Sequence, residues 1–448
     1  MSESTVLAVP PPGVAVAPAP APAAASPRLT TARGAALYIG ALLGPGLLLL
    51  PGLAAAAAGP ASLLAWAGLL GLSALFAVVF TALGRAFPSA GGVIGYVTAG
   101  LGARPGLAAG WSFLAGVIAG APVVCLIGAG YLTELTGGGR VGQAVIAAAL
   151  LLTVLALAAG GMRTSATAQL LMVSLLIVVV IVAVAGSAAS AHAANWTPFA
   201  PHGWLAVGHA ATTLMLSFVG WEAVAPLTAQ FADPARQLPR VVGITLAVTS
   251  VLYLGLAVVT IAVLGTGSGS LAPLADLLRR AIGPAGTAAG AVAAIVLTLG
   301  AVNAYVNGAA AMAVSLGGTS PRTRRLPARS PIVSGRRAAR PARQPSRRPT
   351  RLLLLAAIAG TGLPLIALYG VGLVSPVSLV AIPTTLFLTV YLGSMLAATR
   401  VLHGLARLAA VPATAATAIM LAYCGWALAV PAAIIAVVTV TGSIRRSR

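Results

Sequence analysis

Long runs of apolar residues, separated by short polar stretches, dominate the chain from about residue 34 onward. A helix needs about 20 apolar residues to cross the hydrocarbon core of a bilayer, and twelve runs approach or exceed that length. They lie at about 35–58, 62–84, 106–132, 142–160, 167–187, 205–228, 241–264, 287–316, 352–370, 376–398, 409–424 and 426–441. The pattern predicts an all-α polytopic membrane protein with about twelve transmembrane helices, in one domain over residues 34–441.

Three segments lack this pattern. Residues 1–33 are rich in Ala, Pro and Val without periodicity, which predicts a disordered tail rather than a signal peptide. Residues 442–448 form a short basic tail. The segment 318–351 holds eleven Arg with Pro and Ser, which predicts a flexible loop. We interpret it as a solvated topology anchor, with binding to anionic lipid headgroups as the alternative and nucleic acid as a remote one.

Composition excludes several protein classes. The chain is 59% hydrophobic and 7% charged, whereas a soluble domain carries about a quarter charged residues. All 26 basic residues are Arg, and there are only five acids. A phosphate-binding loop of the Walker type needs a Lys, which this chain lacks. Catalysis by a pair of carboxylates is disfavoured, because so few acidic residues are present. We therefore expect no enzyme and no cofactor.

The Cys and His residues do not predict a metal site. Cys125 and Cys424 both lie inside apolar runs, as buried thiols do. His192, His202 and His209 fall near one predicted boundary of the membrane, and we interpret them as facing solvent.

The Arg residues also predict orientation, because cytoplasmic loops are enriched in Arg and Lys. With a cytoplasmic N-terminus, 23 Arg lie in inner segments and three, Arg140, Arg279 and Arg280, in outer loops. A single crossing at 409–441 would place the terminal Arg residues outside, so two crossings fit better. We expect a protein of the cell membrane with both termini and the 318–351 loop in the cytoplasm.

Two of the predicted helices contain residues that interrupt a helix. The first run holds Gly44-Pro45-Gly46, and the sixth holds Ser217-Phe218-Val219-Gly220-Trp221-Glu222. Freed backbone groups are tolerated in a bilayer only inside protein or beside a cavity, and half-helix ends there bind anions or cations. A zwitterion such as an amino acid offers one of each. The breaks lie five helices apart, as expected if two repeats of five helices each are related by inverted topology.

Glu222 is the one acid expected near the middle of the membrane. Charge is costly there, so we expect a protonated side chain near neutral pH in at least one state. A neutral packing role is the alternative.

Four segments resemble those of one family, the amino acid/polyamine/organocation permeases with the leucine-transporter-like fold. They are Gly44-Pro45-Gly46-Leu47 through Leu50-Pro51-Gly52, Phe87-Pro88-Ser89-Ala90-Gly91-Gly92-Val93 through Tyr96, Phe218 to Glu222 with Asp233-Pro234-Ala235-Arg236, and Val302 to Gly308. Within the family, the pattern is most similar to bacterial exporters of methionine and branched-chain amino acids.

The resemblance implies a substrate site between the first, third, sixth, eighth and tenth helices. Gly44 and Gly46 would bind the substrate carboxylate through backbone N–H groups, and Val219 and Gly220 would lie near the amino group. Pro45 departs from the family pattern and removes one such donor. The remaining predicted contacts are Phe218 and Trp221 in the sixth helix and Asn303 and Asn307 in the eighth.

These observations predict a secondary active transporter of small neutral amino acids. Proton coupling through Glu222 is favoured, because a sodium site needs several convergent oxygens, for which Thr298 and Asn303 are weak candidates. Export is one of two directions left open. The alternative function is a membrane sensor or scaffold that keeps a permease fold without transport.

Overall fold

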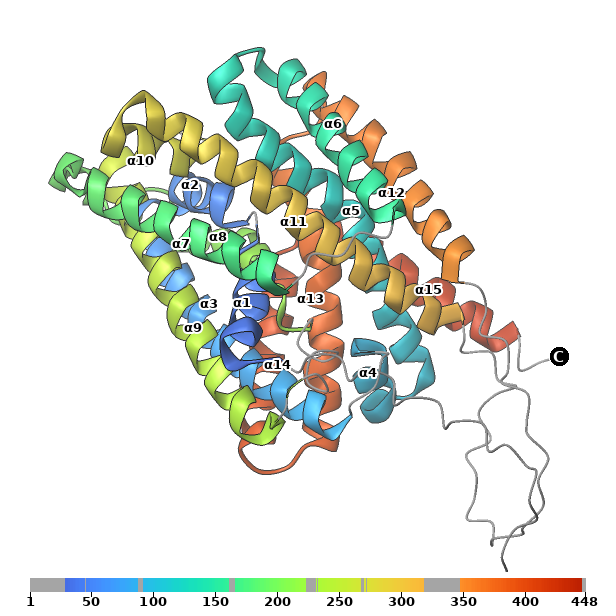
Figure 1. The fold of residues 1–448 in the computed structure, drawn as a ribbon. Helices are drawn as coiled ribbons and strands as arrows, with labels where there is room; N and C mark the ends of the chain where they lie inside the picture. The colour runs from blue at the N-terminus through green and yellow to red at the C-terminus, as the bar shows by residue number, and fades with distance from the viewer. Residues whose placement is uncertain are drawn as a thin grey trace, which may run out of the picture.

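The computed structural model describes residues 29–44, 46–87, 92–160, 166–222, 231, 233–266, 270, 272–317 and 347–444. Across these ranges the chain is helical (Figure 1), apart from one isolated parallel bridge between Leu29 and Phe231. The α-helices are α1 Thr31–Leu42, α2 Gly46–Ala58, α3 Ser62–Ala86, α4 Val93–Leu101, α5 Ala103–Thr136, α6 Gly139–Ala159, α7 Ala166–Ser187, α8 Leu205–Leu214, α9 Pro234–Val259, α10 Pro273–Ile282, α11 Pro284–Gly317, α12 Arg347–Gly370, α13 Pro376–Val401, α14 Gly404–Ala422 and α15 Ala429–Ile444.

The helices match the predicted crossings. In the described ranges, nine helical stretches are long and apolar enough to cross a membrane, one of them running through α2 and α3 from Gly46 to Ala86. Leu205–Phe218 and Gly425–Thr441 are shorter apolar helices. Counting α1 with α2 as one broken crossing, and α4 and α10 as short connecting helices, gives the predicted twelve.

Both predicted breaks are present. α1 ends at Leu42 and α2 begins at Gly46. α8 continues as a 3₁₀ turn, Met215–Phe218, after which Val219 is extended. Pro45 and residues 223–230 lie outside the described residues.

The broken helices lie within a frame of continuous helices (Figure 1). α5 packs against α11, α13, α6 and α12. α1 packs against α9 and α7, and α2 against α8 and α10. Apolar side chains from all these helices form the buried core, and Leu42, Leu43, Gly46 and the residues from Ser217 to Glu222 are buried within it.

The predicted tails and loop fall partly outside the described residues. Residues 1–28, 318–346 and 445–448 are among those not described. α1 begins at Thr31, inside the predicted tail 1–33, and Thr30 caps it by accepting a hydrogen bond from the Arg33 N–H. Residues 347–351 of the predicted loop form the first turns of α12.

Candidate functional site

A cavity lies between the two breaks and the continuous helices α5, α11 and α13, with an empty volume of about 610 Å³ that includes its opening. Apart from the Tyr305 hydroxyl, its walls are apolar side chains and backbone. The lining residues are Leu42, Gly44, Gly46, Gly116, Val117, Gly120, Ala121, Val124, Ile127, Leu216, Val219, Ala301, Val302, Tyr305 and Phe387. The first, third, sixth, eighth and tenth crossings therefore all contribute to this cavity.

The first break exposes backbone to the cavity. A Cβ added at Gly44 would meet nothing within 4 Å, so this residue faces open space. Gly46 begins α2, and the first turn of a helix has N–H groups without helical partners, although the Leu47 N–H donates to the Gly44 carbonyl oxygen at 3.1 Å. The break therefore presents polar backbone groups to whatever occupies the cavity.

Glycines also let the two breaks approach each other. A Cβ at Gly46 would lie 2.6 Å from the Ser217 Oγ atom, and one at Gly220 would lie 2.7 Å from the Ala41 carbonyl oxygen. Gly220 has a φ of 144°, which side chains disfavour. The backbone at each break thus touches the other broken crossing.

Three tyrosines of the frame supply hydrogen bonds to the sixth break. Tyr253 of α9 donates to the Ser217 or Leu42 carbonyl oxygens, at 2.6 and 2.7 Å. Tyr305 of α11 lies 3.4 Å from the Val219 carbonyl oxygen. Tyr391 of α13 accepts hydrogen bonds from the N–H groups of Gly220 and Trp221, both at 3.1 Å. Side chains thus replace the helical partners that this segment has lost.

Glu222 belongs to the same network of hydrogen bonds around the sixth break. Its Oε2 atom accepts from the Tyr391 hydroxyl at 2.6 Å and from the Gly220 N–H at 2.9 Å. Its Oε1 atom is buried and has no partner among the described residues. Tyr391 therefore contacts both the carboxyl group of Glu222 and the backbone of the sixth break.

The structure separates the predicted sixth-helix residues into two groups. Val219 lines the cavity. Phe218 instead packs between Trp66 and Tyr253, with ring centroids 5.9 and 5.2 Å away. Trp221 is fully buried and donates to the Ser73 hydroxyl at 2.8 Å. These two aromatic residues support the break and do not belong to the cavity lining.

Asn303 and Asn307 belong to a polar cluster rather than to the cavity lining. The Asn307 amide donates to the Asn303 carbonyl and side-chain oxygens, at 2.8 and 3.1 Å. Arg351 of α12 donates to the Asn307 side-chain oxygen at 3.1 Å. The cluster joins α11 to the start of α12.

Sequence reasoning missed most of the cavity wall. Gly116 and Gly120 lie in α5, which stays continuous through Pro122. Tyr305 and Phe387 are single aromatic residues in long apolar runs. Tyr253 and Tyr391 are also single aromatic residues within apolar runs, and nothing near them in the sequence marks them as partners of the breaks. Their spacing in the chain carries no information about the breaks, and only the packing of α9, α11 and α13 brings them there.

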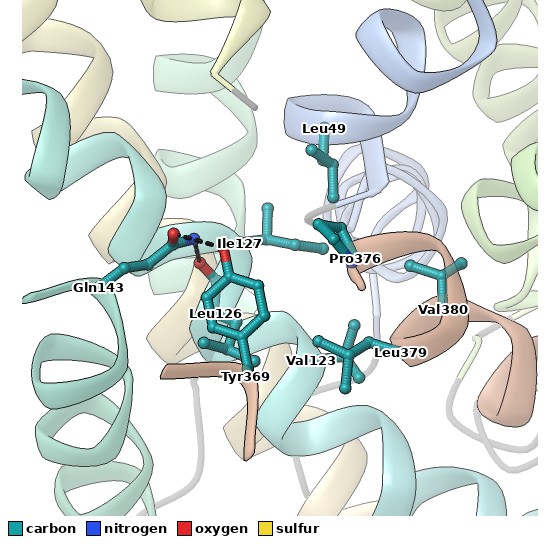
Figure 2. Close-up of a pocket in the computed structure, with 9 residues that line it drawn as sticks. All are labelled: Leu49, Val123, Leu126, Ile127, Gln143, Tyr369, Pro376, Leu379 and Val380. Carbon is teal, nitrogen blue, oxygen red and sulfur yellow. Dashed lines mark hydrogen bonds between the residues drawn. The ribbon is translucent and has the colours of Figure 1, made fainter. Parts of the chain in front are cut away.

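A second, smaller pocket lies beside the cavity and shares Ile127 with it (Figure 2). Gln143 forms its polar edge, donating to the Leu126 carbonyl oxygen at 2.9 Å and accepting from the Tyr369 hydroxyl at 2.7 Å. These bonds connect α6 and α12 to α5, at a distance from both breaks along the chain.

Known proteins share this sequence and fold. The amino acid permease family model matches residues 29–444. The chain is 30% identical over 411 residues to YecA of Bacillus subtilis strain 168, an uncharacterized amino acid permease, covering 91% of this chain and 93% of that protein. It is 29% identical over 245 residues to the L-methionine/branched-chain amino acid exporter YjeH of Escherichia coli K12, covering 52% of this chain and 56% of that protein.

A solved structure supports the fold. The crystal structure of MhsT in complex with L-phenylalanine superimposes with a TM-score of 0.57 at 17% identity, covering 92% of this chain and 98% of that one. This similarity confirms the predicted leucine-transporter-like architecture with broken first and sixth helices. The chain belongs to the amino acid permease family of the amino acid/polyamine/organocation superfamily, and it is a multi-pass membrane protein that transports amino acids.

Proposed function

We propose that this permease moves small neutral amino acids by secondary active transport coupled to protons. The observation that carries the substrate class is the cavity wall, which holds no charged side chain among the described residues that line it. An apolar substrate side chain gains burial there, whereas a second cationic group would lose its hydration without a partner.

The breaks suggest how the shared part of every amino acid binds. The N–H groups at the start of α2, beside Gly44 and Gly46, suit the carboxylate, because the amino end of a helix attracts negative charge. Val219 and Gly220 of the sixth break suit the amino group, because the Val219 carbonyl oxygen lines the cavity side of the break and its hydrogen bond from Tyr305 is long, 3.4 Å. The side chain then points toward Val117, Val124 and Phe387.

Glu222 is the proposed proton carrier. It is buried and bonded to the broken segment through Tyr391, so protonation changes the hydrogen bonds that hold the break. Export is the direction we favour, because the relative YjeH is named as an exporter.

The proposed location is the cell membrane, with both termini and the 318–351 loop in the cytoplasm, because 23 of 26 Arg residues then lie inside. A single cysteine at Ser346, in a chain lacking Cys125 and Cys424, should resist an impermeant reagent added outside. Labelling of that cysteine in intact cells would reverse the topology.

Counterflow in proteoliposomes tests the substrate class. Vesicles loaded with unlabelled leucine should accumulate radiolabelled leucine and methionine, and excess lysine or arginine should compete poorly. Stronger competition by lysine than by leucine would reject the neutral class. No counterflow with any amino acid, from protein that remains monodisperse, would favour the sensor alternative.

A further inference from the structure

Tyr305 of α11 carries the one polar side-chain group among the described residues that line the cavity. The other described lining residues are Gly, Ala, Val, Leu, Ile or Phe. The Tyr305 ring packs against Phe387, with ring centroids 6.2 Å apart, and its hydroxyl reaches the sixth break. Within the described part of the cavity wall, a substrate therefore meets this hydroxyl and the backbone of the breaks as its polar contacts.

The hydrogen bond that this hydroxyl donates is weak. It spans 3.4 Å to the Val219 carbonyl oxygen, whereas O–H···O bonds are usually about 2.5–3.0 Å long. Tyr253, by contrast, donates to the Ser217 carbonyl oxygen of the same segment at 2.6 Å. A phenolic oxygen can also accept a hydrogen bond while it donates one. The Tyr305 hydroxyl therefore adds little to the stability of the break and can serve as an acceptor toward the cavity.

The protonated amine of an amino acid is the substrate group that fits this position. An ammonium group has donors and no acceptor, and a buried charged group needs hydrogen-bond partners. The Val219 carbonyl oxygen and the Tyr305 oxygen can both accept, and at 3.4 Å apart they can both lie at hydrogen-bond distance from one nitrogen atom. A carboxylate has only acceptors, so the Val219 carbonyl oxygen would repel it.

We propose that the Tyr305 hydroxyl binds the α-amino group of the substrate together with the Val219 carbonyl oxygen. The hydroxyl hydrogen keeps its bond to the break, while the hydroxyl oxygen accepts from the amine. Tyr305 is thus a substrate-binding residue that a continuous helix contributes, in addition to the two breaks. This inference deepens the proposed function, since it rests on the placement of the amino group at Val219.

The test replaces Tyr305 with Phe, which removes the hydroxyl and keeps the ring beside Phe387. Displacement of radiolabelled leucine from purified protein gives the affinities of leucine, methionine and α-hydroxyisocaproate, in which a hydroxyl group replaces the amino group of leucine. Thermal unfolding of each protein is followed without ligand. Tyr369→Phe is the matched control, because it also removes a buried hydroxyl, but one that donates to Gln143 outside the lining of the cavity.

Tyr305→Phe should lose affinity for leucine and methionine by the same factor, roughly tenfold, because it removes a hydrogen bond to the charged group that both ligands share. The affinity for α-hydroxyisocaproate should change by less than about threefold, since this ligand has no ammonium group. The unfolding temperature should stay near that of the wild type, because the lost bond to Val219 is weak. Tyr369→Phe should bind all three ligands as the wild type does.

Three results would overturn the proposal. They are wild-type affinity for leucine in Tyr305→Phe, an equal loss for leucine and for its hydroxy analogue, and unequal losses for leucine and methionine, which would place the hydroxyl at the substrate side chain. If the hydroxy analogue displaces no leucine from either protein, equal losses for the two amino acids at an unchanged unfolding temperature support the proposal, and a lower unfolding temperature rejects it.

The substrate class can fail separately from the role of Tyr305. If the wild type binds a charged amino acid better than leucine, the neutral class is wrong. The same comparison, made with that amino acid and its α-hydroxy analogue, still decides whether Tyr305 binds the amino group, because every amino acid carries one.

Discussion

The two breaks differ in how their free backbone groups are used. At the first break, Gly44 borders open space in the cavity, and Tyr253 is the described side chain that bonds its Leu42 carbonyl. At the sixth break, Tyr253, Tyr305, Tyr391 and Glu222 all bond to the backbone between Ser217 and Trp221.

This difference suggests separate tasks for the two segments. Backbone groups left free beside a cavity can bind a ligand, whereas groups already bonded to side chains transmit movement of the helices that carry those side chains. We therefore expect changes at the first break to alter affinity, and changes at the sixth break to alter stability and coupling.

The largest effect is expected from Gly220→Ala. The φ of 144° is unfavourable for Ala, and the new Cβ would lie 2.7 Å from the Ala41 carbonyl oxygen. Strain of this kind costs about 1–3 kcal/mol, so we expect a lower free energy of unfolding and leucine counterflow below about a tenth of the wild type.

Gly243→Ala is the control for that variant. Gly243 is exposed in α9, and an added Cβ there meets nothing within 4 Å, so stability should stay the same or rise slightly. Chemical denaturation and counterflow measure both variants. If Gly220→Ala has the stability and counterflow of the wild type, the packing of the sixth break against Ala41 is not tight.

Glu222→Gln should have an intermediate effect, on coupling. An amide oxygen can still accept from Tyr391 and Gly220, while the side chain no longer carries a proton. Leucine binding should therefore stay near wild type, and transport driven by a pH gradient should fall by roughly tenfold as its pH dependence disappears.

Glu134→Gln is the matched control, because Glu134 is exposed at the end of α5. Flux is followed at several pH values, and leucine affinity by a binding assay. An unchanged pH profile in Glu222→Gln would make Glu222 a structural residue and end the coupling proposal.

The smallest effect is expected from Gly44→Ala. The new methyl group meets no atom within 4 Å, so folding should be unaffected, but it occupies space in the cavity. One methylene group in a hydrophobic pocket is worth about 10–200-fold. Because the new methyl group here meets open space, we expect a smaller effect, about a threefold loss of affinity for leucine and a larger loss for phenylalanine.

Gly68→Ala provides the comparison for this change, since Gly68 is exposed on α3 with nothing within 4 Å of an added Cβ. Competition binding with leucine and phenylalanine gives both affinities. A loss of stability in Gly44→Ala without a loss of affinity would contradict the assignment of the first break to ligand binding.

Sequence patterns predicted the crossings because each helix must satisfy its own backbone hydrogen bonds in lipid. The apolar run 106–132 became α5 at Ala103–Thr136, and 287–316 became α11 at Pro284–Gly317. The breaks were predicted for a local reason, since Gly and Pro weaken a helix, although α5 and α13 stay continuous through Pro122 and Pro383. Gly44, Gly46 and Val219 were found in this way.

Tertiary structure decided what surrounds each break. Phe218 and Trp221 are neighbours of Val219 in the chain, but the turn at Gly220 directs them to Tyr253 and Ser73 rather than to the cavity. Tyr253 and Tyr391 reach the breaks only because α9 and α13 pack there. The sequence by itself determined which segments cross the membrane and where two of them break, because those properties depend on neighbouring residues. Which side chains serve the broken backbone depends on contacts between distant helices, and only the folded chain sets them.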